Sequence, residues 1–321
     1  MAVIKNVAII GVSSRVDMSS LYLLSRTHIK QAAGALGEPT LNALVKSSFN
    51  VTVLARSTTK GTFPPSVKTV TIDYEDVASI TEALRGQDAV VSTVASEAIL
   101  AQTAVIDAAV AAGVKRFIPS EFGSDLNNPK VTALPVFGHK VVINKYLAEK
   151  AAANPKFSYT QVRNGAFLDW GLQYNIFLDW RNDKPRIFDG GDGKFSTTTL
   201  ASVARAVAGV LEHPDETKNR AVYVQDIVTT QNKILAIAKE VAPEKTKTWE
   251  LVPTSLEVIK KAADDAVANG QFSFEVMVEY LYCASMGGVY GALMEKTDNE
   301  LLGVAGDKTD ADIEAILKSV L

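Results

Sequence analysis

Three glycines near the N-terminus have the residue type and setting of a phosphate-binding loop. Gly11 ends an apolar, strand-like run, and Gly34 and Gly37 precede a segment with helical spacing. If residues 12–31 are set aside, Gly11 joins Ala32 and the loop reads G-A-A-G-A-L-G. Glycines there permit a tight turn and close approach of the backbone to a pyrophosphate, and the N–H groups of the following helix bind the phosphates. The pattern predicts a dinucleotide-binding loop formed by Gly11, Ala33, Gly34, Leu36 and Gly37.

The segment from 12 to 31 interrupts this pattern. It begins with Val-Ser and ends with Gln, which the two ends of an intron can encode, and Thr27-His28 can encode a branch-point sequence. We hypothesise that the segment is the in-frame translation of a short retained intron; the alternative is a genuine surface insertion. Within the phosphate loop it would weaken cofactor binding, unless it folds outward and lets Gly11 and Gly34 meet. A further alternative is a chain that binds no cofactor.

Arg56 stands at the end of the second strand-like segment, where dinucleotide-binding proteins select their cofactor. An acidic residue at this place binds the ribose 2′-hydroxyl of NAD(H), whereas an arginine accommodates the 2′-phosphate of NADP(H). Lys60 follows shortly after and can assist. The pattern therefore favours NADP(H) as the cofactor; the alternative is that Arg56 and Lys60 are solvated charges.

Apolar strand-like segments alternate with helical segments through the first half of the chain. Segments that are apolar throughout indicate parallel strands covered on both faces, and right-handed crossovers then give a doubly wound α/β sheet. Residues 1–165 are expected to form this Rossmann-type domain. Residues 166–321 are expected to form a smaller, mostly helical substrate lobe, with some segments returning to the sheet. The cleft between the two parts is the default binding site.

The composition argues against several classes of function. A net charge of −3 without a basic stripe argues against nucleic acid as a partner, because such surfaces need concentrated Lys and Arg. The N-terminus does not resemble a secretory signal, and there is no apolar stretch of about twenty residues, so a cytoplasmic protein without a membrane partner is expected. The three histidines lie far apart and predict no metal site. A homo-oligomer is compatible with the sequence.

The lone cysteine, Cys283, lies in the apolar run YLYCASM. A single cysteine forms no internal disulfide, and a thiol in apolar surroundings keeps its proton and is a poor nucleophile. We therefore expect Cys283 to be a buried structural residue.

Longer motifs give the chain a resemblance to a known family. The run VIDAAVAAGVKRFIPSEFGSD, residues 105–125, resembles a signature of the isoflavone reductase-like and NmrA-like families, which are atypical short-chain dehydrogenases/reductases. The motifs VAIIG…GALG, VTVLARS, FGHK, SYTQVRNGAFLDWG and the late DNELLG match further parts of the same pattern. Apart from residues 12–31, the similarity covers most of the chain.

The resemblance implies an NADPH-dependent reductase of a small, aromatic or phenolic substrate. The family's key lysine corresponds to Lys140 in the motif FGHK. A lysine desolvated in an apolar cleft has a lowered pKa and can accept or relay a phenolic proton, while NADPH delivers hydride to the neighbouring carbon. Counting back without gaps from Tyr159 places Lys145 in this position instead. Without the resemblance, Lys140 would be interpreted as a solvated lysine on a lysine-rich helix.

Tyr146 and Lys150 offer a competing interpretation of the same helix. They satisfy the Y-x-x-x-K pattern of ordinary short-chain dehydrogenases, in which the tyrosine is the acid and the lysine lowers its pKa. The spacing puts both side chains on one helical face, which suits that chemistry. The pattern is short enough to recur by chance, so we favour Lys140.

Residues after the fifth expected strand and further along complete the implied site. The resemblance places Ser120 and Phe122 beside the nicotinamide; the alternative is that Phe122 fills the core and Glu121 is an ordinary cap. Buried aromatic residues more often belong to a core than to a binding site. The residues expected on the substrate side, with a core role as the alternative, are Asn164, Phe167 and Trp170.

The ends of two earlier strands contribute further expected cofactor contacts. Ligands of doubly wound folds bind outside the carboxyl ends of the strands. Thr93 and Val94 are therefore expected to contact the ribose side through their backbone. Asp73 either lies near the adenine or serves a simple turn.

A regulator without turnover is the main functional alternative. NmrA-like proteins can have the same fold, bind the dinucleotide and act as redox-sensing partners of other proteins. Lys140 discriminates between the two, because a sensor does not need a proton-transferring lysine. We favour the reductase.

Overall fold

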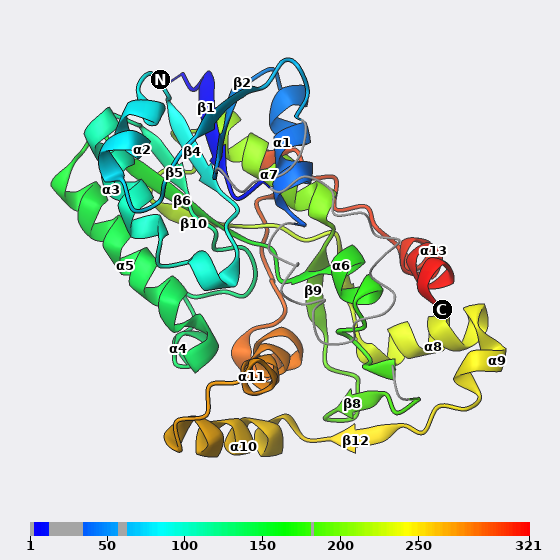
Figure 1. Cartoon of the computed structure of the whole chain (residues 1–321). Helices are drawn as coiled ribbons and strands as arrows, with labels where there is room; N and C mark the ends of the chain where they lie inside the picture. The colour runs from blue at the N-terminus through cyan, green and yellow to red at the C-terminus, as the bar shows by residue number, and fades with distance from the viewer. Residues whose placement is uncertain (1–2, 13–34, 57–62, 181–182) are drawn as a thin grey trace.

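A seven-stranded parallel sheet forms the larger part of the molecule (Figure 1). The structure, a computed structural model, describes residues 3–12, 35–56, 63–180 and 183–321. The strand order is β10-β6-β5-β4-β1-β2-β3, and every pairing in it is parallel. This order, with β1 in the interior of the sheet between β4 and β2 and helices on both faces, confirms the predicted doubly wound α/β fold. The strands are β1 (Asn6–Ile10), β2 (Asn50–Ala55), β3 (Lys68–Thr71), β4 (Ala89–Ser92), β5 (Arg116–Ile118), β6 (Ser158–Arg163) and β10 (Arg220–Tyr223).

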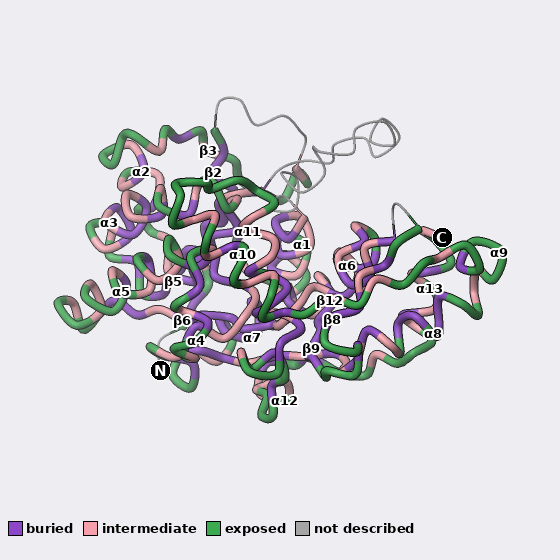
Figure 2. Tube along the Cα trace, turned by 90° about the horizontal axis from the view of Figure 1, so that it is seen from below, coloured by how far each residue is buried: buried purple, intermediate pink, exposed green. Residues whose placement is uncertain are grey.

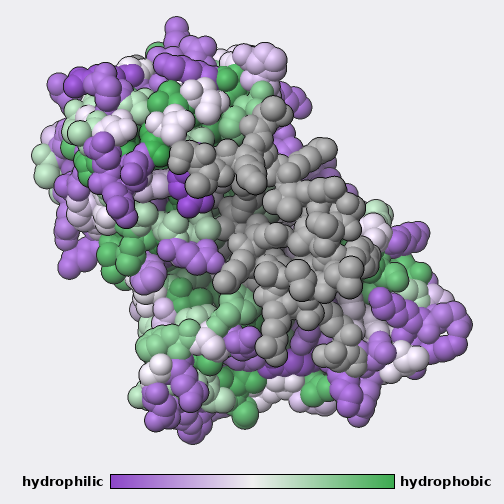
Figure 3. Space-filling model, viewed as in Figure 1, coloured by the Kyte–Doolittle hydropathy of each residue, from purple (hydrophilic) through white to green (hydrophobic). Residues whose placement is uncertain are grey.

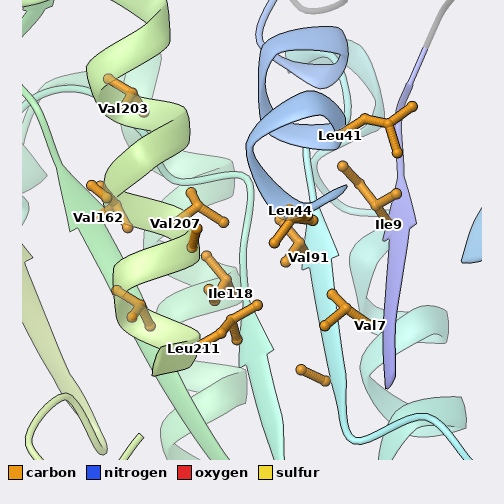
Figure 4. Packing of buried hydrophobic residues seen from close by; sticks show 14 of the residues in the cluster. Val7, Ile9, Leu41, Leu44, Val91, Ile118, Val162, Val203, Val207 and Leu211 are labelled. Atoms are coloured by element: carbon orange, nitrogen blue, oxygen red, sulfur yellow. The ribbon is translucent and has the colours of Figure 1, made fainter. Parts of the chain in front are cut away.

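The apolar character of β1 suits its position as an interior strand of the sheet. Val7 and Ile9 pack into the core on one face, whereas Ala8 and Ile10 pack into the core on the other. Because successive side chains of a strand point to opposite faces, a strand covered on both sides must be apolar at every position. Figure 4 shows the first of these cores, with Val7 and Ile9 beside Leu44 of the adjoining helix.

Helices cover both faces of the sheet. One face carries α1 (Gly37–Lys46) and α7 (Leu200–Glu212), which pack against each other. The other carries α2 (Val77–Leu84), α3 (Gln102–Ala112) and α5 (Gly138–Ala153). The helix α7 and the edge strand β10 follow the start of the second lobe in sequence, yet they lie on the sheet.

The remainder of the chain builds a second lobe around its own core. Two small sheets, with strand orders β11-β9-β7 and β12-β8, lie among helices, and buried aromatic residues such as Phe177, Phe195 and Tyr280 fill the interior. Figure 2 shows buried residues in both parts. The elements are β7 (Ala166–Phe167), α6 (Leu168–Gln173), β8 (Arg186–Phe188), β9 (Phe195–Thr198), β11 (Ile227–Thr229), α8 (Gln231–Val241), α9 (Pro243–Thr246), β12 (Val252–Thr254), α10 (Leu256–Ala268), α11 (Phe274–Met286) and α13 (Asp310–Val320).

Short elements join the two parts. The helix α4 (Pro129–Thr132) and the turn Pro135–Phe137 precede α5, and α12 (Asn299–Leu302) packs on α7. On the face shown in Figure 3, hydrophilic residues are spread over the described surface with scattered apolar patches between them. In the ranges that the structure describes, none of the helices has the length and apolar character needed to cross a membrane.

The loops after β5 and β6 face the second lobe. A small crevice is lined by Ser124, Asp125 and Gly165 from these loops, and by Ala284 and Met294 among others from the second lobe. The carboxyl edge of the sheet is therefore next to the second lobe, as the predicted cleft requires.

Candidate functional site

Gly11 and Gly37 meet at the carboxyl end of β1 in an arrangement that only glycine permits. Gly11 has a φ of +82°, and a Cβ atom built on it would lie 2.5 Å from the carbonyl carbon of Thr93. A Cβ atom on Gly37 would lie 3.0 Å from the carbonyl oxygen of Gly11 and 2.9 Å from Cα of Val12. Strand β1, the end of β4 and the start of α1 therefore approach too closely for any side chain.

At the N-terminus of α1, the N-cap residue gives the backbone N–H groups no side-chain hydrogen bond. Leu36 occupies the cap position, is buried, and cannot accept a hydrogen bond with its side chain. Uncapped N–H groups and the helix dipole favour an anion at this end. The neighbouring loop residues Ala33 and Gly34 lie outside the described residues.

Thr93 and Val94 hold the end of β4 to its neighbours. The Thr93 hydroxyl and backbone N–H both donate to the carbonyl oxygen of Ile10, at 2.8 and 2.9 Å. The carbonyl oxygen of Val94 accepts a hydrogen bond of 2.8 Å from Ser120 Oγ, and Gln102 Oε1 accepts one from the Ser120 backbone N–H. These bonds bring the ends of β1, β4 and β5 together at one edge.

Arg56 and Asp73 lie at the ends of neighbouring strands. Ala55 of β2 pairs with Thr71 of β3, so Arg56 comes directly after the paired residues. The positive charge of Arg56 opposes the effect of burial, which raises the pKa of Tyr74. Asp73 is exposed and accepts a hydrogen bond of 3.0 Å from the Glu75 backbone N–H, which is a turn role. Lys60 lies outside the described residues.

Lys140 extends from the first turn of α5 to the segment that follows β5. Its Nζ atom donates hydrogen bonds of 2.9 Å to the carbonyl oxygen of Glu121 and 3.0 Å to that of Phe122. A Cβ atom on Gly123 would lie 4.0 Å from this nitrogen, and Gly123 has a φ of +136°. Burial of the ammonium group lowers the pKa of Lys140; the charge of Glu121 opposes this shift and that of Arg163 adds to it.

Glu121 and Arg163 form an ion pair beneath Lys140. Oε1 of Glu121 lies 2.5 Å from Nη1 of Arg163, and each side chain is only 1% exposed. The contact is close but lacks the alignment of a hydrogen bond. Burial raises the pKa of the Glu121 carboxyl, and the charges of Arg163 and Lys140 act against the shift. From the sequence alone, Glu121 is expected to be only an ordinary cap, and no role is predicted for Arg163.

The three expected substrate-side residues occupy different settings. Asn164 is fully buried, and its backbone N–H donates to the carbonyl oxygen of Gly123 at 3.2 Å. Its Oδ1 atom has no hydrogen-bond partner among the described residues. Phe167 is half-buried and packs against the core between the sheet and α7, and the half-buried ring of Trp170 lies 5.2 Å from that of Tyr174. Asn164 is thus the one tied directly to the segment beneath Lys140.

Tyr146 and Lys150 contact a different helix. The Tyr146 hydroxyl donates to Asp107 of α3 at 2.6 Å, and Lys150 forms an ion pair with the same carboxylate at 2.5 Å. These contacts fasten α5 to α3 on the outside of the sheet. Lys145, the alternative to Lys140, is exposed on α5.

A larger cavity of about 350 Å³ lies away from these residues, among the N-terminal ends of β5 and β6. It includes the buried Arg116, which donates to Ser158, Thr160, Thr217 and the carbonyl oxygen of Pro214. Burial lowers the pKa of Arg116 to about 10. Since its bonds join β5, β6 and the loop before β10, we interpret Arg116 as a structural residue.

The cysteine thiol and the possible metal-ligating side chains also limit the chemistry that the protein can perform. Cys283 is fully buried in the second lobe, as expected, and burial raises the pKa of its thiol to about 11, which disfavours the reactive thiolate. Across the described ranges, no group of three or more His, Cys, Asp and Glu side chains is placed to hold a metal ion.

Comparison with known proteins identifies the family. The model of the NmrA-like family matches residues 25–283. The chain is 33% identical to oxidoreductase poxI of Penicillium oxalicum over 297 residues, which covers 90% of this chain and 92% of that protein. It is 31% identical to oxidoreductase aprR of Aspergillus flavus, covering 89% and 97%. The chain belongs to the NmrA-like family, and its relatives confirm the expected class, an oxidoreductase.

Solved structures confirm the fold. The structure titled AtPrR2 with NADP+ and (+)pinoresinol matches with a TM-score of 0.72 and 19% identity, covering 98% of this chain and 99% of that one. A leucoanthocyanidin reductase–NADPH complex from Vitis vinifera matches with a TM-score of 0.69 and 17% identity, covering 97% and 99%. At these identities the likeness shows the shared Rossmann-type architecture.

Proposed function

We propose that the protein is an NADP(H)-dependent reductase of a small aromatic or phenolic molecule, with Lys140 as the proton relay or general base. The observation that carries this proposal is the position of Lys140. Its amine, with a lowered pKa, lies at the same sheet edge as the glycine loop and the ends of β1, β4 and β5. A cofactor in the loop and a proton-transferring group thus share one edge.

The loop fits the dinucleotide. Gly11 and Gly37 let the ends of β1 and β4 and the start of α1 pack together where a Cβ atom would overlap backbone atoms, and the N-cap residue Leu36 gives the helix N–H groups no side-chain hydrogen bond. We expect Gly11, Ala33, Gly34, Leu36 and Gly37 to hold the pyrophosphate, and Arg56 and Lys60 to hold the 2′-phosphate. Thr93, Val94, Ser120 and Phe122 would border the ribose and nicotinamide, and Asp73 would lie on the adenine side. The AtPrR2 and leucoanthocyanidin reductase structures, which contain NADP+ and NADPH, support this cofactor.

The chemistry divides between the cofactor and the protein. NADPH supplies hydride. Lys140 in its neutral form accepts a phenolic proton, and in its ammonium form it stabilises the resulting oxyanion. The carbonyl oxygens of Glu121 and Phe122 direct its Nζ atom. Asn164, Phe167 and Trp170 are proposed to line the substrate side, with the unsatisfied Oδ1 of Asn164 available to a donor group.

The test combines cofactor binding with turnover. NADPH fluorescence titration measures affinity, and loss of absorbance at the reduced nicotinamide band reports oxidation with a panel of phenols and benzylic ethers. We expect oxidation with at least one member, a fall of about 10²–10⁴-fold in Lys140→Ala, and unchanged rates in Lys145→Ala, a control on the exposed face of the same helix. Tight NADPH binding without oxidation, and without an effect of Lys140→Ala, would favour the redox-sensing regulator.

A further inference from the structure

Three sets of contacts hold the segment from Glu121 to Gly123 in place. Its carbonyl oxygens at Glu121 and Phe122 accept hydrogen bonds from Lys140. The carbonyl oxygen of Gly123 accepts from the backbone N–H groups of Asn164 and Gly165, at 3.2 and 3.1 Å. The Glu121 side chain pairs with Arg163. The position of the Lys140 amine therefore depends on how firmly this segment is held.

The Glu121–Arg163 pair links two parts of the sheet that are not adjacent in sequence. Glu121 follows β5, and Arg163 is the last residue of β6. Removing both charges from water is costly, and a buried pair is often no more stabilising than apolar residues of similar volume. A gain in folding stability therefore does not explain why two charged residues are buried here. Their effect on Lys140 does explain it, because the pair fixes the local geometry and sets the electric field at the lysine amine.

The pair acts on Lys140 with two opposite charges. Glu121 favours the ammonium form, and Arg163 favours the neutral amine. Beyond Arg163 lies Asp125, whose Oδ1 atom is 3.9 Å from Nε of Arg163 and accepts a hydrogen bond from the Tyr223 hydroxyl. Glu121 and Arg163 thus act on the lysine amine, and Asp125 and Tyr223 continue the contacts from Arg163.

We propose that Glu121 and Arg163 are positioning residues for Lys140: their ion pair fixes the carbonyl oxygens that aim the lysine amine, and their opposed charges set its protonation balance. The proposal rests on the proposed function of Lys140 for its catalytic consequence. The coupling of the two buried charges to the Lys140 amine does not depend on the identity of the substrate.

The decisive experiment titrates the Lys140 amine directly. Full-length protein labelled with 13Cε-lysine is followed by NMR against pH, and the resonance absent from Lys140→Arg is assigned to Lys140. We expect the midpoint to move to lower pH in Glu121→Gln and to higher pH in Arg163→Met. Glu279→Gln, which breaks a comparable Arg186–Glu279 ion pair in the second lobe, should leave the midpoint unchanged. Shifts of the same sign in both variants, or no shift, would overturn the proposal.

A second measurement keeps the proposal testable if the single variants do not fold. The double variant Glu121→Gln/Arg163→Met removes both members of the buried pair, so neither is left as an isolated buried charge, and near-UV circular dichroism checks its fold. We expect its kcat to fall at least tenfold while its NADPH affinity stays within about twofold, because the carbonyl oxygens are no longer fixed; an unchanged kcat would overturn the proposal. The NMR titration needs no substrate, so failure to find turnover would count against the proposed function and not against this coupling.

Discussion

Gly11 and Gly37 lie against each other although 25 residues separate them in the sequence: a Cβ atom on Gly37 would be 3.0 Å from the Gly11 carbonyl oxygen. The two ends of the interrupted glycine pattern are therefore together in space. This closeness is what a dinucleotide loop requires of its first and last glycines. Because the two glycines are already close, a shorter connection can join them. The effect of residues 12–31 on the loop can therefore be tested by deleting them.

Deletion of residues 12–31 should leave the fold intact and strengthen NADPH binding. The deletion joins Gly11 to Ala32 and restores the continuous sequence G-A-A-G-A-L-G. We expect a lower dissociation constant for NADPH in a fluorescence titration, with an unchanged circular dichroism spectrum. A deletion variant that binds NADPH no better than the full chain would show that the segment does not obstruct the loop.

The intron hypothesis has a separate test in the transcript. If residues 12–31 are translated intron, sequencing of transcripts across this junction should find molecules that lack the corresponding nucleotides in frame. If every transcript carries them, the segment is a genuine insertion, whatever the deletion variant does in vitro.

Gly11→Ala should damage the cofactor loop more than an ordinary glycine substitution. Both Gly11 and Gly86 have a positive φ, +82° and +77°, but a Cβ atom on Gly86 would meet nothing within 4 Å. Gly86→Ala therefore measures the cost of backbone strain alone, about 1–2 kcal/mol of the free energy of unfolding. Gly11→Ala should cost about 1–3 kcal/mol more through overlap with Thr93, and should lower NADPH affinity. Equal losses in denaturant melts would contradict the close approach.

Arg56→Ala should reduce the preference for NADPH over NADH. A hydrogen bond from a charged donor contributes about 1.5–3 kcal/mol, so we expect NADPH affinity to fall roughly 10–100-fold while NADH affinity barely changes. Arg85, an exposed arginine paired with Glu82, provides the matched control. If Arg56→Ala weakened both cofactors equally, Arg56 would not contact the 2′-phosphate.

The Y-x-x-x-K pair should be dispensable for catalysis. Tyr146→Phe and Lys150→Met remove contacts with Asp107 between α5 and α3. We expect a loss of about 0.2–1 kcal/mol in the free energy of unfolding, as for other partly exposed pairs, and kcat/KM within about twofold of the unchanged protein. A loss of two orders of magnitude in kcat/KM with normal folding would move the proton transfer from Lys140 to Tyr146.

Much of the sheet could be predicted because its signal is local. The largely apolar β1 and β4, and the helical spacing of α2 and α3, can each be recognised in a short stretch of sequence. Strands β6 and β7 are separate because the chain turns at Gly165, which has a φ of +61° and where a Cβ atom would be 2.3 Å from the Ser196 carbonyl oxygen. That close approach belongs to the second lobe, which no local window reveals.

The residues of the candidate site could be predicted only where they belong to a recognisable sequence motif. The glycines and Lys140 could be named from motifs, whereas Arg163 could not, because its role depends on Glu121, 42 positions earlier. One signal was available: a charged residue ends an otherwise buried strand, β6, and a buried charge needs a partner. The partner itself is defined by the sheet, which places the ends of β5 and β6 side by side.

The most direct test of the central claim is the pH dependence of kcat/KM for NADPH-dependent reduction, compared between the unchanged protein and Lys140→Ala. Burial lowers the pKa of Lys140 from its ordinary 10.5. If its neutral amine accepts the substrate proton, kcat/KM should rise with pH through a midpoint below 10.5, and this rise should vanish in Lys140→Ala. A rise that persists with the same midpoint in Lys140→Ala would contradict the assignment of proton transfer to Lys140.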